Sequence, residues 1–187
     1  MEIQKENKII AFCKKYGMYL AVGAVVFVMA LTFTMVAVSS GTKQVSVSPL
    51  KFELPMTNAM ILKDYCDDAL QNNETLNQWE AHMSVDMASA DGNVYAILDG
   101  TVAKIDYNFL DGHSITINHQ GGLVSVYSSL KDEITHKVGD VVKAGEKIGQ
   151  ASTTASSEID LGEHLCLTMK IGGDYVDPNN YLDLQQK

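Results

Sequence analysis

Hydrophobic and polar residues alternate one by one over much of the second half of the chain. The period of two is clear in residues 100–107, 113–119 and 123–127, and it is typical of strands with one buried and one exposed face. Asp-Gly or Gly-Gly pairs separate these segments, as expected for short turns. The pattern predicts an antiparallel β meander. Because helix patterns are scarce outside the N-terminal region, we expect an all-β domain.

The apolar positions of this pattern define a predicted core. Residues 138–149 add β-branched residues and three glycines, a combination that predicts a tight hairpin closing one side of the sheet. Residues 68–77 are polar and predict an exposed loop or hairpin. Trp79 and Tyr127 are expected to pack beside a groove. The predicted core residues are Val94, Ile105, Ile115, Ile117, Val124, Val126, Ile148, Leu165 and Leu167.

The N-terminal region has a different pattern, with one long apolar run. Residues 17–38 contain no charged side chain over 22 positions, enough at about 1.5 Å per residue to cross a hydrocarbon core of about 30 Å. We therefore expect a transmembrane helix. A cleaved signal peptide is the alternative, because Ala37 and Ser39 resemble a small-x-small cleavage site, but the run exceeds the usual length of about 7–15 residues.

Charge orients this predicted helix. Four lysines and two glutamates precede it, and the positive-inside preference keeps residues 1–16 in the cytoplasm. Residues 39–50 are small and polar and predict a tether, which leaves residues 51–187 as an extracytoplasmic domain. From residue 39 onward there are 10 lysines, 21 acidic residues and no arginine, a net charge of −11. Nucleic acid is therefore a poor candidate partner.

Two short constellations contain candidate metal ligands. His82 and Asp86 are four residues apart, about 13 Å along a straight strand, so they bind one ion only if the chain bends between them. Otherwise they are unrelated surface residues. His164 and Cys166 are two apart and share one face of a predicted strand. Cys66 lies in the same compartment as Cys166, although nothing local requires a disulfide between them.

These constellations belong to an ordered series of segments. The His82-x-x-x-Asp86 motif, residues 94–102, 117–130 and 138–149, and the segment from Gly162 to Cys166 resemble, in order, the blocks of the lysostaphin-type (LytM-like) zinc endopeptidases. The resemblance covers residues 55–182. Within that family, the membrane-anchored layout and residues 52–82 are similar to the stage II sporulation protein Q group of spore formers. The resemblance implies a LytM-like antiparallel β fold.

The resemblance also implies roles for individual residues. His82 and Asp86 match two zinc ligands, and His164 matches a catalytic histidine. Cys166 stands where the third ligand, a histidine, is expected, and Ser129 replaces the other catalytic histidine. A thiolate binds zinc well, but with His82 and Asp86 it leaves the site formally neutral, so bound water is polarised less. Losing a transition-state donor typically costs about 10²–10³ in rate.

Two functions follow as expectations. The first is an anchored, degenerate domain in the forespore membrane that docks the outer domain of stage III sporulation protein AH during engulfment. The alternative is a zinc metalloendopeptidase that cleaves peptidoglycan peptides, with zinc on His82, Asp86 and Cys166 and with His164 as the base. The sequence leaves zinc binding open. By resemblance, the Ser/Thr/Ala loop at residues 151–157 forms the rim of the substrate groove, and Ser84 replaces a usual glycine.

Overall fold

The computed structural model describes residues 12, 15–19, 21–29 and 50–184. The chain divides into two compact units, residues 1–48 and 49–187. In the first unit, the described residues are helical, and no described helix is long and apolar enough to cross a membrane. Residues 20 and 30–38 of the predicted span lie outside the described residues, as does most of the predicted tether. The transmembrane helix and its flanking segments stay predictions.

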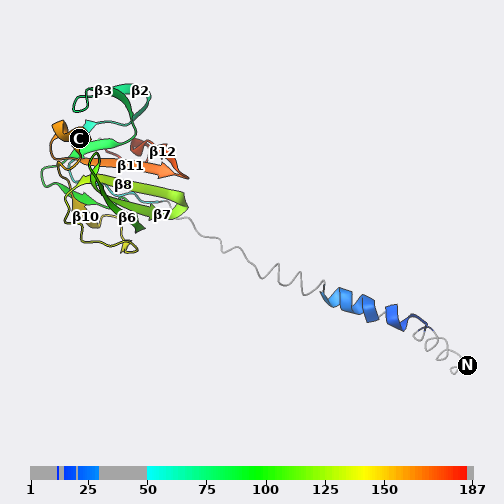
Figure 1. The fold of residues 1–187 in the computed structure, drawn as a ribbon. Helices are drawn as coiled ribbons and strands as arrows, with labels where there is room; N and C mark the ends of the chain where they lie inside the picture. Colours follow the sequence, from blue (N-terminus) through cyan, green and yellow to red (C-terminus); the bar gives the residue numbers. More distant parts are fainter. Residues whose placement is uncertain (1–11, 13–14, 20, 30–49, 185–187) are drawn as a thin grey trace, which may run out of the picture. The chain divides into compact units, whose positions relative to one another are not determined.

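The second unit is built around one antiparallel sheet of eight strands (Figure 1). Its consecutive strands β6 (Gly100–Asn108), β7 (Gly112–His119) and β8 (Leu123–Leu130) are neighbours, so the predicted meander is confirmed. The order across the sheet is β1 (Met60–Lys63), β4 (Val85–Ala88), β11 (Leu165–Ile171), β8 (Leu123–Leu130), β7 (Gly112–His119), β6 (Gly100–Asn108) and β9 (Val141–Val142), and β12 (Asp174–Val176) also pairs with β11.

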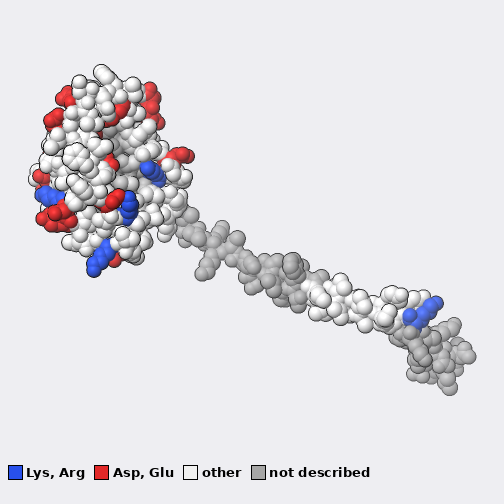
Figure 2. Space-filling model, in the orientation of Figure 1, with Lys and Arg blue, Asp and Glu red and all other residues white. Residues whose placement is uncertain are grey.

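Two small sheets and three short 3₁₀ segments complete this unit. Strand β2 (Cys66–Asn73) pairs with β3 (Gln78–His82), and β5 (Asn93–Tyr95) pairs with β10 (Lys147–Gln150). The 3₁₀ segments are η1 (Gln120–Gly122), η2 (Ser156–Leu161) and η3 (Pro178–Asn180). Residues 50–184 contain no α-helix, and the predicted all-β antiparallel fold is therefore confirmed for this unit. Acidic side chains are spread over its visible face, with lysines between them (Figure 2).

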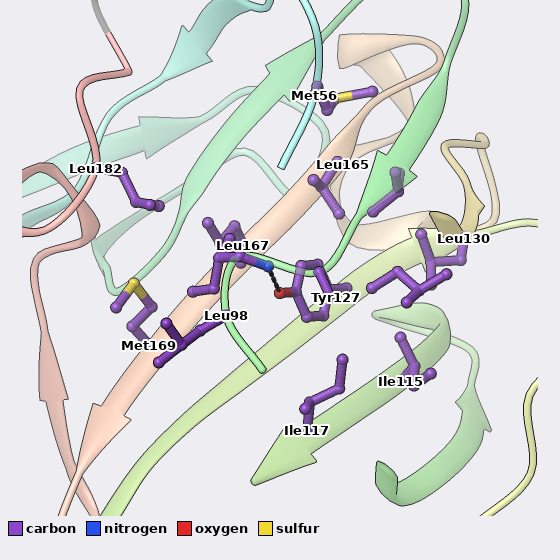
Figure 3. Close-up of a cluster of buried hydrophobic side chains, with 14 of the residues drawn as sticks. Met56, Leu98, Ile115, Ile117, Tyr127, Leu130, Leu165, Leu167, Met169 and Leu182 are labelled. Atoms are coloured by element: carbon purple, nitrogen blue, oxygen red, sulfur yellow. Dashed lines mark hydrogen bonds between the residues drawn. The ribbon is translucent and has the colours of Figure 1, made fainter. Parts of the chain in front are cut away.

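One face of the main sheet carries the hydrophobic core. Figure 3 shows Tyr127 among aliphatic side chains, with its hydroxyl accepting a hydrogen bond of 2.9 Å from the backbone N–H of Ile97. This bond satisfies the polar end of a fully buried aromatic side chain. Six predicted core residues are buried, namely Val94, Ile115, Ile117, Ile148, Leu165 and Leu167.

The prediction chose the wrong face of β8. Val124 and Val126 are only partly buried, whereas Leu123, Ser125 and Tyr127 point into the core. A period of two defines two faces without saying which one is buried. Here the larger side chains Leu123 and Tyr127 decide, and Ser125 is tolerated inside because its hydroxyl lies 2.7 Å from Nε2 of His119.

Irregular pairing explains two further differences. A register shift between Val102 and Lys104 buries Val102 and leaves Ile105 only partly buried. Residues 138–149 form no hairpin of their own, because β9 pairs with β6 and β10 pairs with β5. A turn closed by a 2.9 Å bond from Glu146 N–H to the Lys143 carbonyl passes the chain from one sheet to the other.

Residues 68–77 were predicted to form either an exposed loop or a hairpin, and they form a hairpin. Residues 68–77 lie within the β2–β3 hairpin and its turn. Trp79 in β3 is 68% exposed, so it does not pack as predicted. Tyr127 does pack, but within the hydrophobic core and not beside a groove. Trp79 instead lines an open hollow together with residues of β1 and η2, among them Leu62 and Leu161.

Candidate functional site

A change of strand partner brings His82 and Asp86 together. His82 ends β3, which pairs only with β2, and Asp86 lies in β4, which pairs with β1 and β11. The chain bends at Met83 and Ser84, between the two sheets. As a result, His82 Nε2 lies 3.0 Å from Asp86 Oδ2, far closer than a straight strand allows. Ser84 Oγ also lies 3.1 Å from His82 Nε2.

Strand pairing places Cys166 beside Asp86. The two residues are directly opposite in β11 and β4, and Ser128 of β8 is opposite Cys166 on the other side. His164 lies just before β11 and is fully buried. Its Nδ1 donates a 2.8 Å hydrogen bond to the Gly162 carbonyl, which leaves Nε2 unprotonated in the neutral ring and available to the cluster.

Glu158 joins the cluster from a different part of the chain. It belongs to η2, and its side chain is 12% exposed. Its Oε1 lies 3.4 Å from His82 Nε2, and its Oε2 lies 3.7 Å from His164 Nε2. The sequence analysis missed Glu158. The one available signal was its position directly after the loop expected at the groove rim.

Burial and neighbouring charges both shift the pKa values of the side chains in the cluster. Burial lowers the pKa of His82, but Asp86 and Glu158 outweigh burial and raise that pKa to about 9. Burial raises the pKa of Glu158, but the contacts with His164 and His82 hold it well below its usual range. Burial, together with the charge of Glu158, raises the pKa of Asp86. Without metal, the cluster at neutral pH therefore contains an ion pair between protonated His82 and ionised Glu158.

The cluster leaves buried polar atoms without hydrogen bonds. Both carboxylate oxygens of Asp86 and Nε2 of His164 are buried and have no hydrogen-bond partner. Within residues 50–184 and the described helix, one set of three His, Cys, Asp or Glu side chains has ligand atoms within 4.8 Å of one another: His82, Asp86 and Glu158. Cys166 is not in this set. Burial, together with the charges of Asp86 and Glu158, raises the pKa of its thiol well above the usual range.

Ser129 donates its hydroxyl to the backbone and not to a side chain of the cluster. It is fully buried with a φ of 59°, a conformation that non-glycine residues rarely adopt. Its hydroxyl donates a 2.9 Å hydrogen bond to the Ser152 carbonyl, and its backbone N–H donates one of 2.9 Å to the Asp111 carbonyl. The hydroxyl is therefore committed to the loop after β10 and does not replace the missing imidazole as a donor.

A groove of about 470 Å³ runs along the sheet face opposite the core. His82, Glu158 and Cys166 lie on its lining together with Ser157, so the loop predicted at the rim does contribute to it. Leu76, Leu110 and Tyr175 add apolar lining and are 40%, 52% and 48% exposed. Ser129 is not among the lining residues. The groove therefore has a volume within the range of ligand-binding clefts and a lining that is both polar and apolar.

Comparisons with known proteins agree with this geometry. The chain is 33% identical over 110 residues to stage II sporulation protein Q of Bacillus subtilis (strain 168), a match that covers 57% of this chain and 38% of that protein. It also resembles a chain of the SpoIIQ–SpoIIIAH pore-forming complex, with a TM-score of 0.63 and 25% identity over 72% of this chain and 92% of that one.

A zinc-containing peptidase from Vibrio cholerae has the same fold in part, with a TM-score of 0.50 and 25% identity over 63% of this chain and 35% of that one. The chain therefore spans less than two thirds of this peptidase and of the curated sporulation protein. The family model of peptidase family M23 matches residues 80–178. This match extends over more than half of the chain, from just before His82 to just after β12, and the chain therefore belongs to peptidase family M23.

Proposed function

We propose that this chain is a membrane-anchored docking protein of sporulating cells that uses a degenerate M23 domain as its binding surface. The observation that carries the proposal is Ser129. By resemblance it stands at the position of a catalytic histidine, and its hydroxyl donates a hydrogen bond to the Ser152 carbonyl, which also accepts the backbone N–H of His164. A domain that has lost this donor keeps the shape of the groove but loses much of its power to stabilise a transition state.

Similarity supports a partner and a location. Stage II sporulation protein Q is a relative at 33% identity, and a similar chain occurs in a complex with SpoIIIAH. We infer a forespore membrane anchor at residues 17–38, a cytoplasmic N-terminus and a domain that projects into the intermembrane space. There it binds the outer domain of a stage III sporulation protein AH. The tether at residues 39–50 extends at most about 40 Å, so the groove operates close to the membrane.

Zinc peptidase activity is the second candidate. M23 enzymes are zinc metallopeptidases, and His82, Asp86 and His164 of this chain converge as a peptidase requires. His164 is then the general base, and its Nε2 is the atom that accepts a proton. Ser129 argues against this candidate, because its hydroxyl is hydrogen-bonded to the Ser152 carbonyl and does not replace the catalytic imidazole.

Two assays on the full chain separate the candidates. For docking, the purified chain is mixed with the outer domain of the stage III sporulation protein AH of the same organism, and we expect co-elution on gel filtration. For hydrolysis, the chain is incubated with purified cell walls, and we expect no release of peptide fragments. His164→Ala serves as the variant, and His136→Ala, which lies outside the cluster, serves as its control.

Opposite results would reverse the conclusion. Release of wall peptides that His164→Ala abolishes and His136→Ala preserves would establish the peptidase. Failure to co-elute, with both proteins folded by circular dichroism, would remove the proposed partner.

A further inference from the structure

We propose that Glu158, and not Cys166, is the third protein ligand of a zinc site that also contains His82 and Asp86. This inference does not rest on the docking function. It concerns which residues of this chain hold the metal in an M23 domain that lacks the usual final histidine. The ligand comes from η2, outside the strand on which the missing histidine is expected.

The distances between side-chain atoms of the cluster fit tetrahedral coordination of one zinc ion. Nitrogen and oxygen ligands lie about 2.0–2.2 Å from zinc, so two ligands of a tetrahedral site lie about 3.3–3.5 Å apart. His82 Nε2 is 3.0 Å from Asp86 Oδ2 and 3.4 Å from Glu158 Oε1. All three ligand atoms lie within 4.8 Å of one another. Small side-chain adjustments therefore suffice to surround one ion.

The buried atoms of the cluster lack the partners that a cation supplies. Asp86 is fully buried, and neither of its oxygens accepts a hydrogen bond. Oδ2 has a 3.0 Å ionic contact with His82 Nε2, but burial of a carboxylate without hydrogen bonds is costly. His82 Nδ1 donates a 2.9 Å hydrogen bond to the Asp64 carbonyl. In the neutral ring that bond places the lone pair on Nε2, which faces Asp86 and Glu158, and this is the usual arrangement around a metal-binding histidine. Zinc would take the place of the proton that Nε2 carries in the metal-free chain.

Cys166 is adjacent to this set but does not complete it. It is opposite Asp86 across the β4–β11 pair, yet its sulfur is not within 4.8 Å of the ligand atoms of both His82 and Asp86. Cys166 would have to move to reach both ligands, but Glu158 would not, because its carboxylate already lies between His82 and His164. The zinc ligand set therefore contains oxygen and nitrogen and no sulfur.

The charged side chains around Glu158 are compatible with zinc binding to its carboxylate. Lys63 Nζ lies 3.7 Å from Glu158 Oε1 and 3.9 Å from Glu80 Oε1, so it keeps an acidic partner when a cation binds Glu158. His164 is on the other side of the carboxylate. Zinc with one neutral imidazole and two carboxylates is formally neutral, and it polarises bound water less than a site with two histidines and one carboxylate does.

A zinc ligand from η2 would let the metal connect segments on two sides of the groove. Ser156 and Ser157, which precede Glu158, donate side-chain hydrogen bonds to the carbonyls of Phe109 and Leu110 in the β6–β7 turn. Zinc on Glu158 therefore connects that turn and η2 to the bend between β3 and β4. We expect the metal to hold the shape of the groove.

Zinc affinity measured on the full chain by competition with a chromophoric chelator tests the assignment. We expect Glu158→Gln to weaken zinc binding by at least about tenfold, equivalent to about 1.4 kcal/mol. Cys166→Ser should change the affinity by less than about threefold, equivalent to less than about 0.7 kcal/mol. Glu163→Gln, an exposed carboxylate near the site, is the matched control and should bind zinc like the unmodified chain. Circular dichroism confirms that each variant is folded.

Cobalt in place of zinc provides a test without any variant. A thiolate ligand produces a sulfur-to-cobalt charge-transfer absorption in the near ultraviolet, and the proposed site should not show it. The proposal is overturned by that absorption, by a chain that binds no zinc, or by Glu158→Gln that binds zinc equally or more tightly. Tighter binding by Glu158→Gln would mean that Glu158 competes with the metal for His82. None of these results bears on docking, which is measured by co-elution.

Discussion

Raising the pH should destabilise the metal-free domain through His82. Its pKa is about 9 in the folded chain and about 6.5 when unfolded. Between these values the folded state binds more protons than the unfolded state, so stability falls as pH rises. The contribution is fully present below pH 6.5 and is lost as the pH passes through about 9.

The size of this effect follows from the same two values. A difference of about 2.5 pKa units corresponds to about 3 kcal/mol of unfolding free energy. His82 is only 5% exposed, so solvent screening reduces this little. Burial lowers the pKa of His164, but the hydrogen bonds to Glu158 and Gly162 outweigh burial and raise it. His164 therefore also makes stability fall as the pH rises. The lowered pKa of Glu158 affects stability only in acid, below its usual range.

Urea unfolding with a chelator present, at several pH values from about 6 to 9.5, measures this slope. Circular dichroism is the suitable signal, because Trp79 is 68% exposed and its fluorescence changes little on unfolding. His82→Asn should remove most of the slope, and Glu158→Gln should reduce it. An unmodified chain whose stability is flat across this range, or a His82→Asn variant with the same slope, would refute the reasoning.

Two further predictions concern stability. Tyr127→Phe removes the acceptor for the buried N–H of Ile97 and should cost about 1–3 kcal/mol in urea unfolding; no loss would mean that water replaces the hydroxyl. Gly112 and Gly121 both have a φ near +72°. A Cβ added at Gly112 would lie 2.2 Å from Thr154 Oγ1, whereas a Cβ added at Gly121 would have no atom within 4 Å. Gly121→Ala should therefore cost about 1–2 kcal/mol from backbone strain, and Gly112→Ala should cost clearly more.

Local pattern was sufficient for several features of this chain. Alternation with Asp-Gly and Gly-Gly turns predicted β6, β7 and β8 and their antiparallel order, because side chains of a strand alternate between two faces whatever the strand pairs with. The ordered motifs predicted the family. They also set the condition for a metal site at His82 and Asp86, since only a bend brings residues four apart in an extended chain onto one ion and the alternative was two unrelated surface residues.

Contacts between distant segments decided the rest. Which face of β8 is buried depends on its neighbours, and the pattern alone favoured Val124 and Val126 over Tyr127. Glu158 lies in a 3₁₀ segment without periodicity, 76 residues after His82, so no local rule connects the two. Side-chain chemistry and strand spacing are written in the sequence, but the atoms that meet in a buried site depend on how separate strands and loops pack around it.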